Sequence, residues 1–227
     1  MLECFQPPAT TMPAPSPRTE VHRKPQRANY DLATIRAIID EALFCHIAFQ
    51  DAAGVHCLPT ACWREGDHLY IHGANNSRLV DALQARECSV CITHLDGLVL
   101  ARSAFHHSMN YRSVVIYGQF VSVDTPEGKE AALLAFLEHV SPGRTSKCRP
   151  PAAAELAGTT VLRLPLSEAA AKIRNWGVED SAEDLEIPVW AGVVPLHLRA
   201  SKARPEDGCA GLPEPTPPPF LTVRSDE

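Results

Sequence analysis

The sequence of 227 residues has no uninterrupted apolar run of about 18 residues, and its first residues lack the basic stretch and apolar core of a signal peptide. We therefore expect a protein that neither enters a membrane nor leaves the cytoplasm. The net charge of -6 argues against general binding of nucleic acid, whose phosphates attract basic surfaces. A small-molecule ligand is the expected partner.

Several motifs of common enzymes are also missing. The chain has no GxGxxG, no GxxxxGK[ST], no HExxH and no GxSxG, so dinucleotide-binding folds, P-loop NTPases, zincins and α/β-hydrolases lose their sequence support. A serine-histidine nucleophile within 101–113 has no orienting acid beside it. Cys88 and Cys91 lie three apart in an expected strand, where they would face opposite sides, so no metal site is expected.

Proline is concentrated at the two ends. Of 20 prolines, 12 fall within 1–27 and 200–227, and eight lie in between. Proline-rich ends of this kind are typical of solvated extensions. The sequence predicts one domain over 28–199, with a disordered N-terminal extension (1–27) and a disordered tail (200–227).

Short apolar runs bounded by turn residues predict strands joined by hairpins. The expected strands are 44–49, 55–63, 68–72, 88–95, 98–103, 111–123 and 159–166, with Asp96-Gly97 as a hairpin turn. The expected helices are 32–43, 78–86, 126–140 and 167–175. Few helices between hairpin-joined strands favour a mainly β (α+β) fold, an antiparallel β-barrel with peripheral helices.

The stretch YIHGANNSRL, residues 70–79, has the layout of a phosphate site. A strand ends at His72, a polar loop follows, and a helix begins with Ser77 as N-cap and Arg78 as its first residue. A helix start, a hydroxyl and a guanidinium offer three kinds of donor, although a capped surface helix with a solvated arginine is the simpler alternative. Pro59 marks its strand as an edge or a bulge facing a ligand. A flat ring along 59–62, with its phosphate at the helix start, describes flavin mononucleotide (FMN).

The order of these parts resembles the pyridoxamine 5'-phosphate oxidase-like FMN-binding split-barrel superfamily, and more narrowly its flavin-nucleotide-binding, nitroimidazole-resistance-like branch. The resemblance covers about residues 27 to 196 and rests on LYIHGANNSRL, LVLARSAFHHSMNYRSVVIYG, EHVSPGR and IPVWAGVVPL. It implies a six-stranded antiparallel split β-barrel and a homodimer that holds FMN at the subunit interface.

The resemblance also implies roles for individual residues. His72 is the candidate catalytic residue, because in the nitroimidazole-reductase-like proteins a histidine at this strand end lies close to the flavin and substrate. Ser77 and Arg78 match the phosphate-binding pair, and Trp190 matches a tryptophan that closes over the cofactor. The full set of implied cofactor-binding residues is Pro59, Thr60, Ala61, Cys62, Ile71, His72, Ser77, Arg78, Arg112, Ser113 and Trp190.

Two departures from the true oxidases argue against oxidation of vitamin B6. EHVSPGRTSK lacks their Tyr, Arg and Ser set, and residues 195–199 match their C-terminal R-L-H-x-R signature only in part. We therefore expect an FMN-dependent oxidoreductase that reduces a nitro-type or other conjugated acceptor through bound flavin. The alternatives are a flavin store or sensor without turnover, a deazaflavin protein, and a haem-handling barrel with His197 or His106 as axial ligand.

Overall fold

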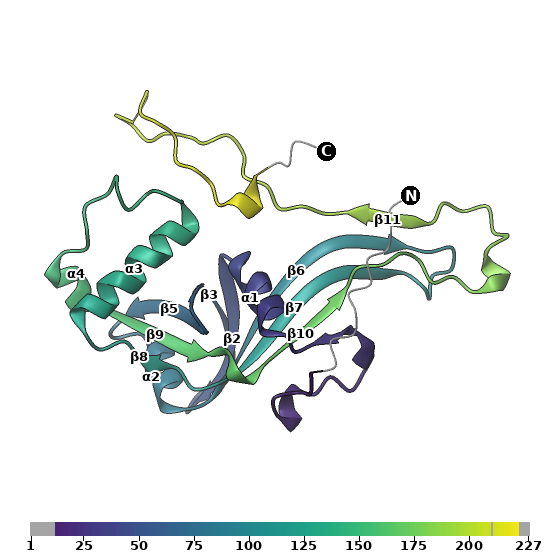
Figure 1. The fold of residues 1–227 in the computed structure, drawn as a ribbon, viewed down its shortest axis with the longest axis horizontal. Coiled ribbons are helices and arrows are strands. Elements are labelled where there is room, and N and C mark those ends of the chain that lie inside the picture. The colour runs from purple at the N-terminus through teal and green to yellow at the C-terminus, as the bar shows by residue number, and fades with distance from the viewer. Residues whose placement is uncertain (1–11, 210, 223–227) are drawn as a thin grey trace.

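Antiparallel β-sheets dominate the computed structural model, which describes residues 12–209 and 211–222. Within these residues, a seven-stranded sheet has the strand order β1-β10-β7-β6-β2-β3, with β11 paired to β6 (Figure 1). A four-stranded sheet has the order β4-β5-β9-β8. The strands of the larger sheet are β1 (Ala28–Asn29), β2 (Phe44–Asp51), β3 (Gly54–Ala61), β6 (Cys88–Leu100), β7 (Ser108–Gly118), β10 (Ala169–Arg174) and β11 (Gly192–Pro195). Those of the smaller sheet are β4 (Trp63–Glu65), β5 (His68–Ala74), β8 (Val121–Ser122) and β9 (Thr159–Pro165).

Helix α1 (Leu32–Asp40) packs into the main core, whereas α2 (Arg78–Ala85), α3 (Pro126–Val140) and the short α4 (Ala153–Gly158) lie at one end of the molecule. Their starts follow the expected capping chemistry. The Asp31 carboxylate accepts a hydrogen bond from the Thr34 backbone N–H at 2.9 Å, and the Thr125 hydroxyl accepts one from Gly128 at 3.1 Å. These caps confirm where the sequence places the starts of α1 and α3.

The main hydrophobic core joins both sheets to α1 and α2. Alternating residues of the strands supply it, such as Ile47 from β2 and Ile71 from β5, and α1 adds Ile35, Ile38 and Ile39. Each such side chain stabilises the fold by about 1.5–3 kcal/mol through burial. A smaller cluster on the far face of β4 and β5 packs Trp63 against α3. The predicted antiparallel split-barrel fold with peripheral helices is confirmed.

Three local predictions were wrong, and the first is the single strand over 111–123, which is divided between β7 in the larger sheet and β8 in the smaller one. Asp96 and Gly97 do not form a hairpin turn, because β6 continues through them with a bulge between Leu95 and Gly97. A Cβ on Gly97 would lie 3.1 Å from Val193 Cγ1 and from the Val194 carbonyl, so this glycine lets β11 approach β6 closely.

The predicted helix over 167–175 is a 3₁₀ turn (Leu166–Glu168) followed by strand β10. This strand lies between β1 and β7, and both neighbours pair with its backbone. Backbone pairing and the burial of Ala169 and Ala171 outweigh the helix preference of an alanine-rich run.

The far ends of β6 and β7, the loop 101–107 between them and β11 form an extension that we call the arm (Figure 1). The arm points away from the side of the molecule that carries α2, α3 and α4. Phe105 in its loop is 90% exposed. Figure 1 thus places the arm at one end of the molecule and α2 at the other.

Both flanking segments contact the domain where they are described. Arg18 forms ion pairs with Glu87 at 2.8 Å and with Glu168, and the Ser141 hydroxyl donates to the Thr216 carbonyl at 3.1 Å. The predicted domain limits stay a prediction, and residues 1–11, 210 and 223–227 lie outside the described part. None of the described helices has both the length and the apolar composition to cross a membrane. The cytoplasmic location also stays a prediction.

Candidate functional site

The candidate site begins on β3, the terminal strand of the larger sheet. His56, Leu58 and Thr60 alternate along β3 and therefore share one face. Leu58 pairs with the fully buried Ile47 but is itself 41% exposed, because the smaller sheet leaves this edge uncovered. The result is an open strip along an edge strand, whose outer backbone groups are available to a ligand. Pro59 was expected to mark an edge or a bulge facing a ligand, and the structure shows the edge, with β3 paired to β2 without a bulge.

The predicted ring-contacting residues divide between the two faces of this strand. Thr60 is half-buried on the open strip, whereas Pro59 and Ala61 face the opposite side. Cys62 is fully buried and marks the point where the chain leaves β3 for β4. Only Thr60 and the backbone of 59–61 are therefore placed to contact a ligand on the strip.

The start of α2 lies against the end of the β2–β3 hairpin. Arg78 places its Nε 2.9 Å from Asp51 Oδ2 and its Nη2 2.9 Å from the ring nitrogens of His56. Asp51 Oδ1 in turn lies 2.9 Å from His56 Nε2. We call Asp51, His56 and Arg78 the edge cluster. Ser77 takes the N-cap position, but its side chain makes no capping hydrogen bond among the described residues.

The electrostatics of the edge cluster keep its carboxylate ionised. Hydrogen bonding from His56 is the largest cause that lowers the pKa of Asp51, followed by the Ala53 backbone N–H and the charge of Arg78. The Arg78 side chain remains 59% exposed. The cluster thus presents a solvent-facing guanidinium that a carboxylate and an imidazole hold in place.

His72 and Ile71 face opposite sides of β5. Ile71 lies in the main core, whereas the His72 ring lies 5.8 Å from the Trp63 ring and 5.1 Å from the Phe136 ring, measured between centroids. Within the described residues, His72 Nδ1 and Trp63 Nε1 are buried without hydrogen-bond partners. Desolvation lowers the pKa of His72, so the ring is neutral at pH 7 and holds one buried nitrogen without a partner among the described residues.

The smaller sheet brings His72 near the open strip. The chain passes from β3 through Cys62 directly into β4, where Trp63 pairs with Tyr70 of β5. His72 lies two residues beyond Tyr70, on the side toward which β3 ends, and β3 and β5 are in contact. The predicted catalytic histidine and the predicted ring-contacting strand are therefore neighbours.

Arg112 and Ser113 already have partners within the chain. Arg112 contacts both oxygens of Asp96, at 3.0 and 2.9 Å, and Glu41 Oε2 at 2.8 Å. Hydrogen bonding to Asp96 is the largest cause that raises the pKa of Arg112. The Ser113 hydroxyl donates to the Lys172 carbonyl at 3.2 Å. Both residues link structural elements in this chain.

Trp190 lies on the arm, two residues before β11, and is 64% exposed. Its ring packs over Gly192, where a Cβ would lie 2.9 Å from Trp190 Cζ2. The arm and the start of α2 lie at different ends of the molecule (Figure 1). One chain therefore does not bring Trp190 and Arg78 together.

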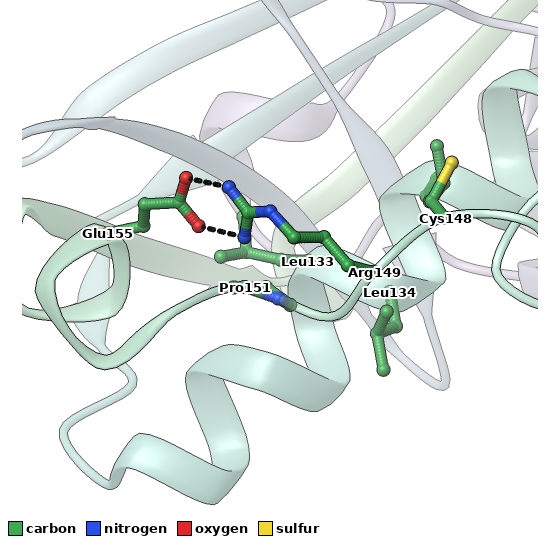
Figure 2. Close-up of a pocket in the computed structure, with 7 residues that line it drawn as sticks. Leu133, Leu134, Cys148, Arg149, Pro151 and Glu155 are labelled. Atoms are coloured by element: carbon green, nitrogen blue, oxygen red, sulfur yellow. Dashed lines mark hydrogen bonds and ion pairs between the residues drawn. The ribbon is translucent and has the colours of Figure 1, made fainter.

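A hollow of about 350 Å³ lies elsewhere, between α3 and the segment that leads to α4. Figure 2 shows Leu133 and Leu134 at this hollow and a two-contact ion pair between Arg149 and Glu155, at 2.8 and 2.6 Å. None of the site residues predicted from the sequence lines it. The open strip lies outside this hollow.

The sequence reasoning missed His56 and Asp51. His56 lies four residues before Thr60, so the two-residue repeat of a strand puts both on one face. Asp51 precedes the turn that returns the chain to His56. This spacing was a usable signal, but the contact with Arg78 depends on how α2 docks.

Comparison with known proteins agrees with this architecture. A family model described as pyridoxamine 5'-phosphate oxidase matches residues 31–173. The flavocytochrome Anf3 from Azotobacter vinelandii is 35% identical, with a TM-score of 0.82, and the match covers 92% of this chain and 96% of that one. The FAD and heme binding protein from Mycobacterium smegmatis is 30% identical, with a TM-score of 0.79 and coverage of 86% and 97%.

A putative 5-nitroimidazole antibiotic resistance protein from Bacteroides thetaiotaomicron shares the fold at 20% identity, with a TM-score of 0.55 and coverage of 64% of this chain and 86% of that one. No curated protein matches the sequence. The fold is thus of the flavin-binding split-barrel class. The chain belongs to the pyridoxamine 5'-phosphate oxidase family.

Proposed function

We propose that the protein is a flavin-dependent oxidoreductase that holds FMN, or the FMN half of FAD, along the open strip of β3. The single observation that carries this proposal is that an uncovered edge strand ends at the solvent-facing guanidinium of Arg78. The similarity to two flavin proteins over most of the chain supports it.

The dimensions of the strip suit such a ligand. From Thr60 to His56 the strand advances about 13 Å, at about 3.3 Å per residue. That advance is comparable with the reach of a five-carbon sugar-alcohol chain and its phosphate. With the ring beside Thr60, the phosphate would meet Arg78, the hydroxyl of Ser77 and the first N–H groups of α2.

The residues present fit the chemistry of a flavin. The outer backbone groups of β3 can pair with the hydrogen-bonding edge of the ring, and the bound flavin would supply the electron transfer. His72, a neutral and half-buried ring in the strand that contacts β3, would give or take a proton at the acceptor. A small conjugated or nitro-type acceptor is the proposed substrate.

We also propose a homodimer, because one chain does not complete the site. Trp190 can close over the flavin only if a second copy brings its arm to this edge. The outer face of the larger sheet suits contact with another copy, since Phe44 is exposed there beside small residues of β3. Three further predicted cofactor contacts remain proposals that need testing in the dimer: Ile71, Arg112 and Ser113.

The test is a titration of the purified protein with FMN and FAD, followed by dialysis and an absorbance spectrum. Retained flavin absorbance supports the proposal, and a colourless protein contradicts it. Reoxidation of the photoreduced, loaded protein by a nitroaromatic acceptor would identify an oxidoreductase. Reoxidation no faster than that of free reduced flavin would favour the flavin store or sensor.

Haem is a second candidate cofactor, because the names of both 30–35% identical proteins describe a haem or cytochrome protein. His106 is half-buried in the arm loop, with its ring 5.4 Å from that of the exposed Phe105, so an apolar surface accompanies this possible ligand. Haem titration should give a Soret band that His106→Ala or His197→Ala abolishes. His107→Ala is the control, since His107 Nδ1 lies 3.0 Å from the Ser103 carbonyl oxygen.

A further inference from the structure

We propose that His56 is a second phosphate-binding side chain of the site and that Asp51 is the residue that positions it. This inference rests on the proposed function, because it concerns the phosphate end of the same flavin. It assigns a role to two residues that the sequence motifs do not mark.

The geometry unites three side chains from three elements. Asp51 is the last residue of β2, His56 lies in β3 and Arg78 begins α2. One Asp51 oxygen lies 2.9 Å from His56 Nε2 and the other lies 2.9 Å from Arg78 Nε. A single carboxylate thus orients both nitrogen-rich side chains toward the same corner.

The carboxylate leaves the donors of Arg78 largely unused. A guanidinium has five N–H groups, and the contacts of Arg78 in the edge cluster involve Nε and Nη2. With the side chain 59% exposed, Nη1 and the second N–H of Nη2 remain for a ligand. Arg78 can therefore bind a phosphate without leaving Asp51.

The imidazole of His56 can join the same phosphate. Its Nε2 donates to the Asp51 carboxylate, and both ring nitrogens lie 2.9 Å from Arg78 Nη2. With Nε2–H held by Asp51, the ring edge that carries Nδ1 would face the phosphate, and an N–H there would donate to a phosphate oxygen. The groups around the ring are Asp51 and Phe49 from β2 and Arg78 from α2.

The position of His56 along β3 is the second argument. His56 shares the open face with Thr60, which lies beside the proposed place of the flavin ring. The sugar-phosphate chain of a flavin bound along this face would therefore reach His56 before it reaches the start of α2. If His56 only linked the β2–β3 hairpin to α2, its side chain would not need to lie on the open strip.

The experiment compares riboflavin, FMN and FAD, because riboflavin has the same ring and sugar chain but no phosphate. Dissociation constants are measured for the full-length protein and for the variants Arg78→Ala, His56→Ala and His56→Gln. His68→Ala is the matched control, because His68 is likewise a half-buried histidine but is the first residue of β5 and is not part of the edge cluster. Thermal unfolding of each variant checks that the fold is retained.

We expect the preference for FMN over riboflavin to fall about tenfold in His56→Ala, the scale of one charge-assisted hydrogen bond. His56→Gln keeps an N–H donor and should recover most of that preference, and His68→Ala should not change it. Asp51→Asn should also lower the preference, because an amide offers one acceptor oxygen in place of two and its NH2 would face the N–H of Arg78 or of His56.

The remaining outcomes overturn the inference. A preference that falls in Arg78→Ala but not in His56→Ala would remove His56 from the phosphate site and leave the proposed function intact. An equal loss of riboflavin and FMN binding in His56→Ala would show that His56 acts only through the fold. If wild-type protein binds none of the three flavins, the proposed function fails, and this inference fails with it.

Discussion

Arg78 Nε and Asp51 Oδ2 lie 2.9 Å apart, so the first residue of α2 is fastened to the last residue of β2. This contact sets where a guanidinium sits at the open end of the edge strand. In the proposed function it also gives the site a direction, with the flavin ring near Thr60 and the phosphate at Arg78.

Arg78→Ala should weaken FMN binding by about 1.5–3 kcal/mol, because the phosphate loses a charge-assisted donor. Quenching of flavin fluorescence during titration measures this loss. Arg86→Ala is the matched control, since Arg86 is an exposed arginine at the other end of α2. Unchanged affinity in Arg78→Ala would place the phosphate elsewhere.

His72 should make the stability of the protein depend on pH. Desolvation lowers its pKa in the folded state below the ordinary value of 6.5, so the unfolded chain binds the proton more readily. Stability contributed by the neutral ring is therefore present above pH 6.5 and is lost as the pH falls toward the folded pKa. The melting temperature of wild type should drop more between pH 7 and pH 5 than that of His72→Gln. Equal drops would mean that His72 does not titrate in this way.

Gly97→Val should release β11 from β6. The added side chain would meet Val193 and the Val194 carbonyl at 3.1 Å, and overpacking of this kind costs about 1–3 kcal/mol. Urea unfolding measures the cost. Gly158→Ala is the control, because nothing lies within 4 Å of a Cβ at that position. Equal stability of the two variants would contradict the close approach of β11.

Arg112→Gln should lower the free energy of unfolding by about 1–3 kcal/mol, because Asp96 and Glu41 lose their common partner. If Arg112 is chiefly a link between α1 and the bulge of β6, the preference for FMN over riboflavin should stay constant. A selective loss of FMN affinity without loss of stability would instead restore Arg112 to the cofactor site.

Complementation between variants should reveal the shared site. A dimer that joins an Arg78→Ala chain to a Trp190→Ala chain contains one intact site if each site takes Trp190 from the other chain. Co-expressed, differently tagged chains should therefore regain about half of the wild-type flavin content per dimer, although each variant alone binds poorly. No recovery would show that Trp190 acts within its own chain or not at all.

Local patterns were sufficient for most of the fold. The capping residues Asp31 and Thr125 fix two helix starts by hydrogen bonds to nearby backbone, and Pro59 identifies an edge strand because it removes a backbone donor. Such signals depend on neighbours within a few residues. They can be interpreted without knowledge of the rest of the chain.

The errors involve distant partners. The alanine-rich β10 has the composition of a helix, and only pairing with β1 and β7 makes it a strand. Asp96-Gly97 has the composition of a turn, yet the glycine serves the approach of β11 from far along the chain. The same limit explains the missed His56 and Asp51, whose contact with Arg78 is tertiary.

The most direct test of the account is the spectrum and mass of the ligand that stays with the protein after incubation with FMN and FAD and exhaustive dialysis, for wild type and Arg78→Ala. The account predicts a bound flavin nucleotide with visible absorbance in wild type and a clearly reduced content in the variant. Wild-type protein without flavin, or wild type and variant with equal content, would contradict the central claim that the edge of β3 and Arg78 hold the cofactor.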